Sequence, residues 1–238
     1  MNFCYKCGAT IENENQKFCI NCGANLTERE EKQTENSNID FDSIYAGLDD
    51  SSKLSKIMDD YEKLFESGLY KEALNLIDYA LEIDPNNDEI LNDKANALSN
   101  LDENDAALLY YRKSLDINPR NPNTLTNLGY NYYKLGKYDL AIETFDEALA
   151  IDPNYFNALN NKAATLHKLG LYEESIQVHR KILTKNPKHV HSLINISATY
   201  FEMGKYKDAL KFIDRALIVE PYNQVALQNK NEILKMIN

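Results

Sequence analysis

The chain has 238 residues, of which 43% are hydrophobic, and it carries a formal net charge of −11 with a pI near 4.9. This hydrophobic content suits a folded protein, whereas the acidic balance argues against a general binder of nucleic acids or anionic membranes, because such binding needs clustered Lys and Arg. The charge is uneven, since residues 1–26 sum to zero, residues 27–53 to −5 and the remainder to −6.

No apolar run reaches the roughly 18 residues that a membrane span requires. The first residues, from Met1 to Cys4, provide neither the basic nor the apolar region of a secretory signal peptide. The C-terminus carries no prenylation or retention signal. The sequence therefore predicts a cytoplasmic protein without a membrane partner, and it leaves the oligomeric state open.

All four cysteines lie close to the N-terminus, as two C-x2-C pairs that are each followed by glycine: Cys4 with Cys7, and Cys19 with Cys22. Two intervening residues let one tight turn present both thiolates, and the following glycine permits a positive φ that turns backbone N–H groups toward the sulfurs. The eleven residues between the pairs are enough for a hairpin that brings the second pair onto the first. This pattern predicts one tetrahedral metal.

Two disulfides or a rubredoxin-like iron site would use the same cysteines. The lack of an export signal counts against disulfides, and the short, aromatic-poor segment between the pairs counts against iron. Zinc is therefore the predicted metal. Residues 1–26 resemble the short zinc-ribbon modules with paired CxxCG motifs at the ends of many prokaryotic proteins, and this resemblance assigns the four ligands to Cys4, Cys7, Cys19 and Cys22.

Four thiolates fill the coordination sphere of zinc and leave no position for an activated water, so the single predicted ion is structural. A module this short cannot bury enough apolar surface to fold unaided, and we expect the metal to supply its stability. Zinc ribbons often contact nucleic acid, but this one is charge-neutral and has only Lys6 and Lys17 as bases.

Residues 27–53 are polar and acidic, and their first part lacks periodicity, as expected of a linker. Toward the end of this segment, Phe41, Ile44, Tyr45 and Leu48 fall on one face of a short helix, with Asp40 as its N-cap. The helix either caps the region that follows or occupies a groove on it, or the segment is a linker with a few apolar residues. The sequence leaves these interpretations open.

From residue 54 onward the sequence repeats with a 34-residue period. The period is marked by prolines and glycines, at Pro85, Pro119, Pro153, Pro187 and Pro221 and at Gly68, Gly136, Gly170 and Gly204. Each period holds two amphipathic stretches; in residues 122–155, Leu125 and Leu128 lie on the buried face of the first, and Ala141 and Phe145 on that of the second. This similarity at a fixed period predicts helix pairs that stack to bury a shared core.

The repeats resemble tetratricopeptide repeats (TPR) over residues 54–223. The resemblance divides this region into five repeats, 54–87, 88–121, 122–155, 156–189 and 190–223, followed by a capping helix over residues 224–238. It implies an all-α fold, a right-handed TPR helical solenoid, preceded by the zinc-ribbon knuckle and hairpin module.

Three departures from the repeat pattern carry expectations. Asp102 replaces the glycine that should end the first helix of its repeat in the left-handed conformation, so the second repeat is expected to be the least regular. His179 replaces an aromatic core residue and is expected to be buried with its hydrogen bonds satisfied. His189 and His191 form an isolated HxH, which is too weak a pattern to indicate a metal.

The resemblance places a binding groove on the first helix of each repeat, at its second, fifth, sixth, ninth, twelfth and thirteenth residues. The candidate groove residues are Asp93, Asn127, Asn161, Asn195 and Asn229 at the sixth position, with Tyr130, Lys134, Lys168 and His191 at others. An amide offers two donors and an acceptor, enough to pair with both sides of a peptide unit. The asparagines therefore predict a site for an extended peptide. The alternative interpretation is that asparagine is common at this position in the family and that this row of asparagines, the asparagine ladder, binds no ligand.

The predicted groove also changes charge along the chain. Asp59, Glu62 and Asp93 come early, whereas Lys134 and Lys168 come late. This order favours a ligand with one basic end and one acidic end.

The ribbon, linker, repeats and capping helix account for the whole chain, and no nucleophile–base pair, phosphate loop or open metal site remains for catalysis. The sequence therefore predicts a non-enzymatic scaffold or adaptor that binds a protein or an extended peptide. The alternative is a nucleic-acid-associated adaptor whose zinc ribbon contacts DNA, RNA or the transcription or translation machinery.

Overall fold

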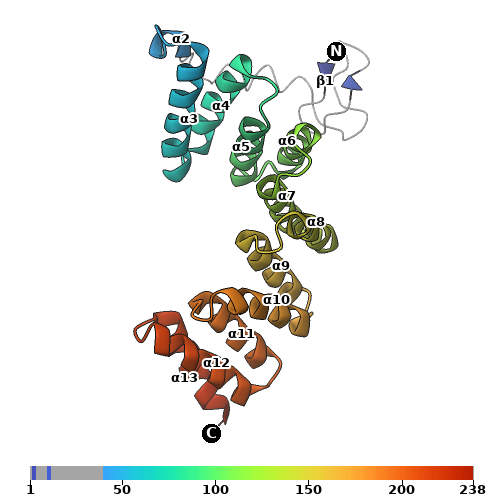
Figure 1. Ribbon diagram of the computed structural model, residues 1–238, viewed down its shortest axis with the longest axis vertical. Coiled ribbons are helices and arrows are strands. Elements are labelled where there is room, and N and C mark those ends of the chain that lie inside the picture. Colours follow the sequence, from blue (N-terminus) through green and yellow to red (C-terminus); the bar gives the residue numbers. More distant parts are fainter. Residues whose placement is uncertain (1, 4–9, 12–39, 238) are drawn as a thin grey trace. The chain divides into compact units, whose positions relative to one another are not determined.

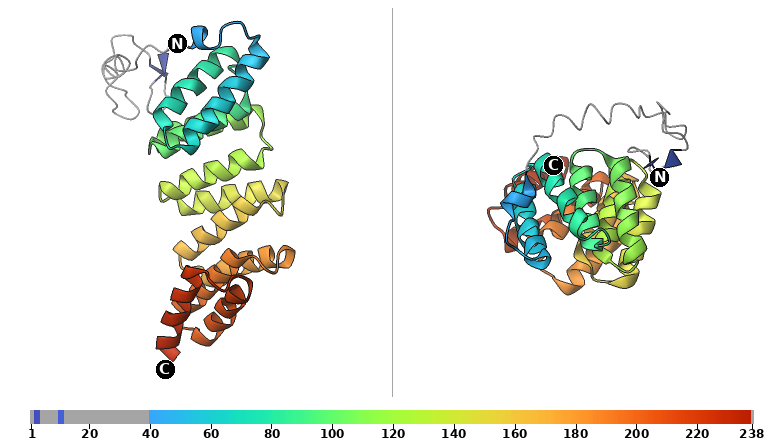
Figure 2. Two further views of the ribbon diagram at one scale, coloured as in Figure 1. Left: turned by 90° about the vertical axis from the view of Figure 1, so that its left-hand side faces the viewer. Right: turned by 90° about the horizontal axis from the view of Figure 1, so that it is seen from above.

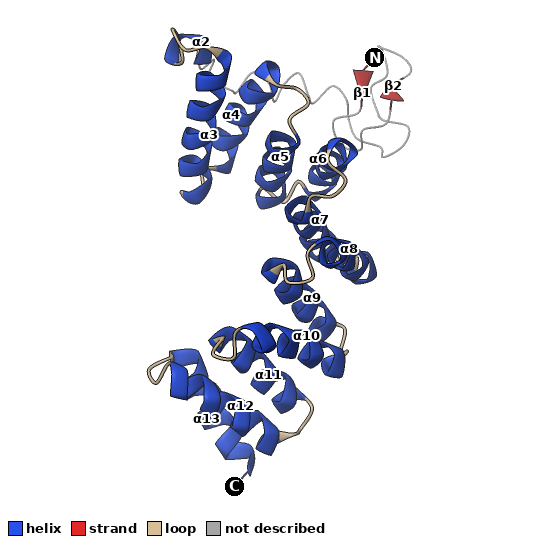
Figure 3. Ribbon diagram, in the orientation of Figure 1, coloured by secondary structure: helices blue, strands red, loops and turns tan. Residues whose placement is uncertain are grey.

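The computed structural model describes residues 2–3, 10–11 and 40–237, and nearly all of these residues are helical (Figure 3). Two short strands, β1 (Asn2–Phe3) and β2 (Thr10–Ile11), pair antiparallel with Phe3 opposite Thr10. The four cysteines lie outside the described residues, as does the first part of the predicted linker. The zinc ribbon therefore stays a prediction.

The described helices form two compact units that meet in the sequence at Asn127 and Leu128 (Figure 1). The first unit contains α2 (Phe41–Ile44), α3 (Asp50–Glu66), α4 (Tyr70–Ile83), α5 (Asp88–Asn100) and α6 (Asn104–Ile117). Helix α7 (Pro122–Lys134) spans the boundary. The second unit continues with α8 (Tyr138–Ile151), α9 (Phe156–Lys168), α10 (Tyr172–Lys185), α11 (Val190–Glu202), α12 (Tyr206–Val219) and α13 (Gln224–Ile237).

The helix boundaries confirm the 34-residue period. Helices α5, α7, α9 and α11 begin at residues 88, 122, 156 and 190, where repeats were predicted to start, and α13 begins at residue 224, where the capping helix was predicted to start. An N-cap precedes Pro122, because the Asn121 side chain accepts a hydrogen bond from the Thr124 backbone N–H at 3.3 Å. Helix α3 differs, since it begins at Asp50, ahead of the predicted start at Leu54, and is capped by Asp49.

The turn of the second repeat is as regular as the others. Gly136 ends its helix at φ +71°, and Asp102 adopts φ +61° at the corresponding place. The closing hydrogen bond has the same length in both turns, 2.9 Å from Glu103 N to Leu98 O and from Lys137 N to Tyr132 O. The expected irregularity was wrong, because aspartate tolerates the left-handed region better than most residues.

The short helix α2 caps the first helix pair, at one end of the first unit (Figure 2). Asp40 accepts a hydrogen bond from Ser43 N at 3.1 Å, as predicted for its N-cap. Phe41 and Tyr45 stack on Tyr79 of α4 with ring centroids 5.2 and 6.1 Å apart, and the Tyr45 hydroxyl donates to an Asp60 carboxylate oxygen at 3.3 Å. These contacts favour the capping interpretation. The other two members of the predicted apolar face are exposed instead, Ile44 at 62% and Leu48 at 41%.

Small residues occur where helices pack most closely. Ala73, Ala107, Ala141 and Ala209, one in each of four second helices, are completely buried. Gly129 of α7 lies so close to Phe145 of α8 that a Cβ atom built on it would be 2.6 Å from the phenyl ring. Phe145 thus fills the space between two helix backbones and is itself completely buried.

Candidate functional site

The four predicted asparagines occupy equivalent positions, each the sixth residue of its helix: Asn127 on α7, Asn161 on α9, Asn195 on α11 and Asn229 on α13. Asn195 is exposed and the other three are partly exposed. Within the described residues, the side-chain amides of Asn161, Asn195 and Asn229 form no hydrogen bond, whereas Asn127 Nδ2 donates to Asn92 Oδ1 at 3.1 Å. The three asparagines of the second unit therefore keep their full hydrogen-bonding capacity for a ligand.

Asp93, the predicted groove residue of α5, lies in a hydrogen-bonded polar cluster of the first unit. Its carboxylate accepts from Asn92 Nδ2 at 3.3 Å and from Asn96 Nδ2 at 3.5 Å. Its backbone carbonyl accepts from the Tyr61 hydroxyl at 3.0 Å, and the Tyr111 hydroxyl donates to Asn96 Oδ1 at 2.8 Å. Two amides thus bind this carboxylate directly, while Tyr61 binds the backbone of the same residue and Tyr111 binds one of the two amides.

Burial raises the pKa of Asp93 to about 6, and the charges of Glu89 and Glu62 add to this effect. The hydrogen bonds from Asn92 and Asn96 act in the opposite direction and stabilise the carboxylate. A cationic group of a ligand placed beside Asp93 would relieve this cost of burying a charge. The arrangement is chemically suited to an ammonium or guanidinium group.

The remaining predicted groove residues are one exposed tyrosine, two lysines at helix C-termini and one histidine near a helix N-terminus. Tyr130 is exposed on α7 and stacks on Tyr133, with ring centroids 6.0 Å apart. Lys134 and Lys168 are the last residues of α7 and α9, where a positive charge complements the helix dipole. His191 is exposed in the first turn of α11.

His189, the other member of the HxH pair, caps α11. Its Nδ1 accepts from Ser192 N at 3.2 Å, and its ring packs edge-on against Phe156 with centroids 4.7 Å apart. The ring of His191 is 5.9 Å from that of His189. Across residues 2–3, 10–11 and 40–237, no group of three or more His, Cys, Asp or Glu side chains is arranged to hold a metal ion.

A cavity of about 200 Å³ lies among α9, α10 and α11 of the second unit. Its lining consists of small apolar and uncharged polar side chains: Ala163, Ala164, His167, Ser175, His179, Asn195, Ala198 and Thr199. His179 is 2% exposed, as expected, but its Nδ1 atom has no hydrogen-bond partner. The prediction that its hydrogen bonds are satisfied was therefore wrong, because no polar side chain of the three helices reaches this nitrogen.

Burial lowers the pKa of His179 to about 4, and His189 and His167 lower it further through charge repulsion. The imidazole is therefore neutral near pH 7. A neutral imidazole can donate or accept at Nδ1, depending on its tautomer. The cavity thus presents an unused hydrogen-bonding group without a charge.

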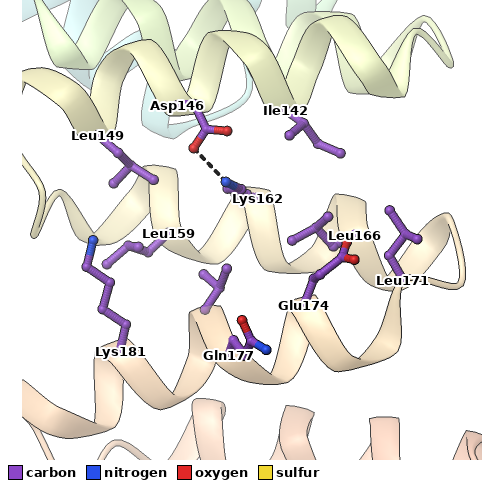
Figure 4. Close-up of a pocket in the computed structure, with 11 residues that line it drawn as sticks. Ile142, Asp146, Leu149, Leu159, Lys162, Leu166, Leu171, Glu174, Gln177 and Lys181 are labelled. Carbon is purple, nitrogen blue, oxygen red and sulfur yellow. Dashed lines mark hydrogen bonds and ion pairs between the residues drawn. The ribbon is translucent and has the colours of Figure 1, made fainter.

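A second, larger cavity of about 590 Å³ lies among α8, α9 and α10, and its lining residues are drawn in Figure 4. Leucine and other aliphatic side chains form most of its surface, and an ion pair between Lys162 and Asp146, 2.5 Å long, crosses one side. None of its lining residues occupies a predicted groove position. This cavity is therefore separate from the predicted peptide site.

The Lys162–Asp146 pair is one of three equivalent ion pairs, which recur in every second repeat and not in every repeat. Equivalent pairs join Lys94 to Asp78 at 2.5 Å and Lys230 to Asp214 at 2.7 Å. Each lysine is the seventh residue of its helix, and the three lysines recur in every second repeat. A comparison of alternate repeats would have found this signal in the sequence.

Among the residues that the structure describes, no helix has the length and apolar character needed to cross a membrane.

The fold is similar to several solved structures. PilW, described as a widely conserved type IV pilus biogenesis factor, is 23% identical with a TM-score of 0.69, and the match covers 77% of this chain and 86% of PilW. PilF of Pseudomonas aeruginosa is 19% identical with a TM-score of 0.68, over 79% of this chain and 86% of PilF. YrrB, described as a TPR protein with an unusual peptide-binding site, is 20% identical with a TM-score of 0.61, over 78% of this chain and all of YrrB. No curated protein matches the chain in sequence.

Sequence models of the repeat match several parts of the chain. A model described as a TPR repeat matches residues 129–170, and one described as a tetratricopeptide repeat matches 76–108 and 110–143. Another tetratricopeptide-repeat model matches residues 190–219. Together these segments cover more than half of the chain, which contains tetratricopeptide repeats.

Proposed function

We propose that the protein is a non-enzymatic scaffold or adaptor that binds an extended stretch of a protein partner along the first helices of its repeats. The observation that carries this proposal is the set of equivalent asparagines, Asn161, Asn195 and Asn229, whose amides form no hydrogen bond within the described residues. Such amides can pair with the main chain of a peptide without reading its side chains.

The expected energies are consistent with a peptide site of modest affinity. Each amide contact contributes about 0.5–1.5 kcal/mol net, and a ligand must offset the entropy lost when its chain is ordered. YrrB, a structure of the same fold, is described as having a peptide-binding site. This description supports a peptide ligand for the present chain as well.

The charges favour a peptide with unlike ends. Groove positions of the first unit carry acidic side chains, including Asp59, Glu62 and Asp93, whereas those of the second unit carry Lys168 and His191. A ligand that places a basic group near Asp93 and an acidic group near Lys168 would match both units. This inference uses the order of the residues in each unit and no placement of one unit against the other.

The asparagines can be tested with a random peptide library selected on the full-length protein, followed by calorimetry of the enriched peptides. Asn161→Ala combined with Asn195→Ala should weaken binding by about 1–3 kcal/mol, because two amide contacts are lost. The matched control, Asn86→Ala with Asn154→Ala, changes two exposed asparagines outside the groove positions and should bind as the wild type does. Equal affinity of both double variants would refute the proposal.

The charge preference has its own test. Lys134→Glu combined with Lys168→Glu should weaken a selected peptide that carries an acidic end, and lowering the salt concentration should enlarge the difference. Unchanged affinity would contradict a ligand with unlike ends, but it would not contradict the proposed asparagine contacts.

A structural zinc head is the second part of the proposal. Pairing of β1 with β2 supports it, because these strands bracket residues 4–9, which include Cys4 and Cys7. A chelator should release about one zinc per chain while helicity, measured by circular dichroism, stays nearly intact. A variant with Cys4→Ser and Cys7→Ser should release none. Loss of helicity in step with zinc would contradict an independent head.

The nucleic-acid alternative is decided by the same pair of proteins. A salt-dependent shift of mixed oligonucleotides by the wild type, lost in the serine variant, would favour contact through the zinc ribbon. The scaffold proposal expects no such shift.

A further inference from the structure

One core position in the repeats differs chemically from all its equivalents. The eighth residue of each second helix is Ile77 in α4, Tyr111 in α6, Phe145 in α8, His179 in α10 and Ile213 in α12. All five are buried. Only His179 leaves a buried polar atom, Nδ1, without a hydrogen bond, whereas the Tyr111 hydroxyl donates to Asn96. Burying such an atom costs stability, which isoleucine or phenylalanine at this position would avoid.

The helix pair α9–α10 is also less filled than its neighbour. In the preceding repeat, the ring of Phe145 packs against the backbone of Gly129 and would overlap a Cβ atom there. At the corresponding places of the next repeat stand Ala163 and the smaller imidazole of His179, and both line the cavity of about 200 Å³. The space that a phenyl ring occupies in one repeat is therefore partly open in the next.

The cavity adjoins the predicted groove. Four of its lining residues, Ala164, His167, Asn195 and Ala198, occupy groove positions of α9 and α11. Asn195 belongs to the ladder that is proposed to hold a peptide main chain. A peptide paired with Asn195 would have a neighbouring side chain within reach of the cavity.

The chemistry of the walls limits what that side chain can be. No Asp, Glu, Lys or Arg lines the cavity, so a charged group would be buried there without a counter-charge. The Ser175 hydroxyl donates to Ala163 O at 2.8 Å, and the Thr199 hydroxyl donates to Asn195 O at 2.8 Å. Both hydroxyls have used their hydrogen and can only accept a further bond. His179 Nδ1 can do either.

We propose that this cavity is a specificity pocket for one uncharged side chain that carries a hydrogen-bond donor, such as tyrosine, glutamine or asparagine, on a peptide held by the groove. The ligand side chain would donate to a hydroxyl oxygen of Ser175 or Thr199 and complete the hydrogen bonding of His179. Purely apolar side chains leave the imidazole unpaired, and charged ones lose their hydration. The pocket rests on the proposed peptide-binding function, which it makes more specific.

The test is a comparison of peptide selection by the full-length wild type and His179→Phe, using the same random library. Peptides enriched on the wild type should share a tyrosine, glutamine or asparagine at one position, and those enriched on His179→Phe should not. A selected peptide should bind the variant about tenfold more weakly, as expected for one lost hydrogen bond. The control Phe145→Ile, which introduces the residue found in α4 and α12, should keep the wild-type preference.

Two outcomes separate failure of the pocket from failure of the groove. Peptides that bind the wild type without a shared donor side chain, or a preference that survives His179→Phe, would overturn the pocket alone. If no peptide binds, the groove function fails, and the pocket is then decided by histidine NMR with N-acetyltyrosinamide and N-acetylphenylalaninamide. The first compound should change the nitrogen shift of His179 Nδ1 and the second should not. No change with either would mean that the cavity holds only water.

Discussion

Asp93 in the first unit occupies a groove position and His179 in the second lies beside one, and both are ionisable side chains shielded from solvent, but their surroundings differ. The carboxylate of Asp93 accepts hydrogen bonds from Asn92 and Asn96. His179 Nδ1 has no partner and adjoins a cavity. The carboxylate in the first unit is thus hydrogen-bonded by neighbouring side chains, whereas the imidazole nitrogen in the second unit lacks a hydrogen bond.

This difference shows how one repeat can acquire a role without a change of backbone. The helices that carry Phe145 and His179 have the same length, 14 residues, and begin at equivalent places in consecutive repeats, at Tyr138 and Tyr172. At the close contact between the two helices of the repeat, Ala163 and His179 stand where the preceding repeat has Gly129 and Phe145. Since both ionisable groups pay a cost for burial, their removal should stabilise the fold, and the pH dependence should be opposite for the two groups.

The largest expected effect is that of His179→Phe. Well above pH 6.5 the histidine is neutral in the folded and the unfolded chain, so its titration does not change the free energy of unfolding there. As the pH falls from 6.5 to about 4, the unfolded chain gains a proton that the folded chain does not, so the wild type should lose up to about 3 kcal/mol. Phenylalanine cannot titrate, and the variant should lose less.

Urea denaturation followed by circular dichroism, near pH 7 and again near the folded-state pKa, measures this difference. At the higher pH the variant should already be more stable by about 1–3 kcal/mol, because it buries no unpaired nitrogen. The second repeat has Ala95 and the buried Tyr111 at the equivalent positions, so an aromatic ring can be accommodated where the facing residue is alanine, as Ala163 is here. Equal pH slopes for the two proteins would show that the imidazole protonates as easily in the folded state as in the unfolded one.

Asp93→Asn should give a smaller gain with the opposite pH dependence. The folded pKa of about 6 lies above the ordinary 3.8, so the charged form is disfavoured in the fold at neutral pH and the lost stability returns as the pH falls below 6. The amide removes the charge but offers only one acceptor oxygen, and we expect a gain of about 1–2 kcal/mol near pH 7. The gain should vanish near pH 4.

Asp59→Asn is the matched control, since it makes the same change at the sixth position of the first repeat, where the side chain is exposed. It should alter the free energy of unfolding by less than about 0.5 kcal/mol. A similar gain from both variants would mean that net charge, rather than burial at Asp93, is responsible.

The regular part of the fold could be predicted because its signals are local. A proline follows the end of each second helix at a fixed distance, so the helix starts at 122 and 156 followed directly from the 34-residue period. Phe41 was placed on a helix correctly for the same reason, whereas the helix ends at Ile44 and Tyr45 is its C-cap. The burial of Phe41 and Tyr45, and the exposure of Ile44, depend on Tyr79, a partner on a different helix that periodicity cannot identify.

The site was predicted less completely because its chemistry depends on contacts between helices. The sequence placed Asn127 and Asn161 at equivalent positions, yet Asn127 pairs with Asn92 of the preceding repeat. The replacement at His179 was visible in the sequence. Its unpaired nitrogen was not, because it follows from the side chains that three different helices bring to the cavity.

The smallest expected effect compares the turns of the two units. Asp102→Gly should stabilise the chain by about 0.5–1 kcal/mol, because glycine adopts a positive φ without the steric cost that aspartate pays. Gly136→Ala should destabilise by a similar amount, and since a Cβ atom there meets nothing within 4 Å, its cost arises from the backbone alone. Thermal denaturation of both variants measures the pair. If Asp102→Gly were destabilising, the aspartate side chain would have to contribute more through its contacts than its backbone conformation costs, and the first unit would depend on this residue as more than a substitute for glycine.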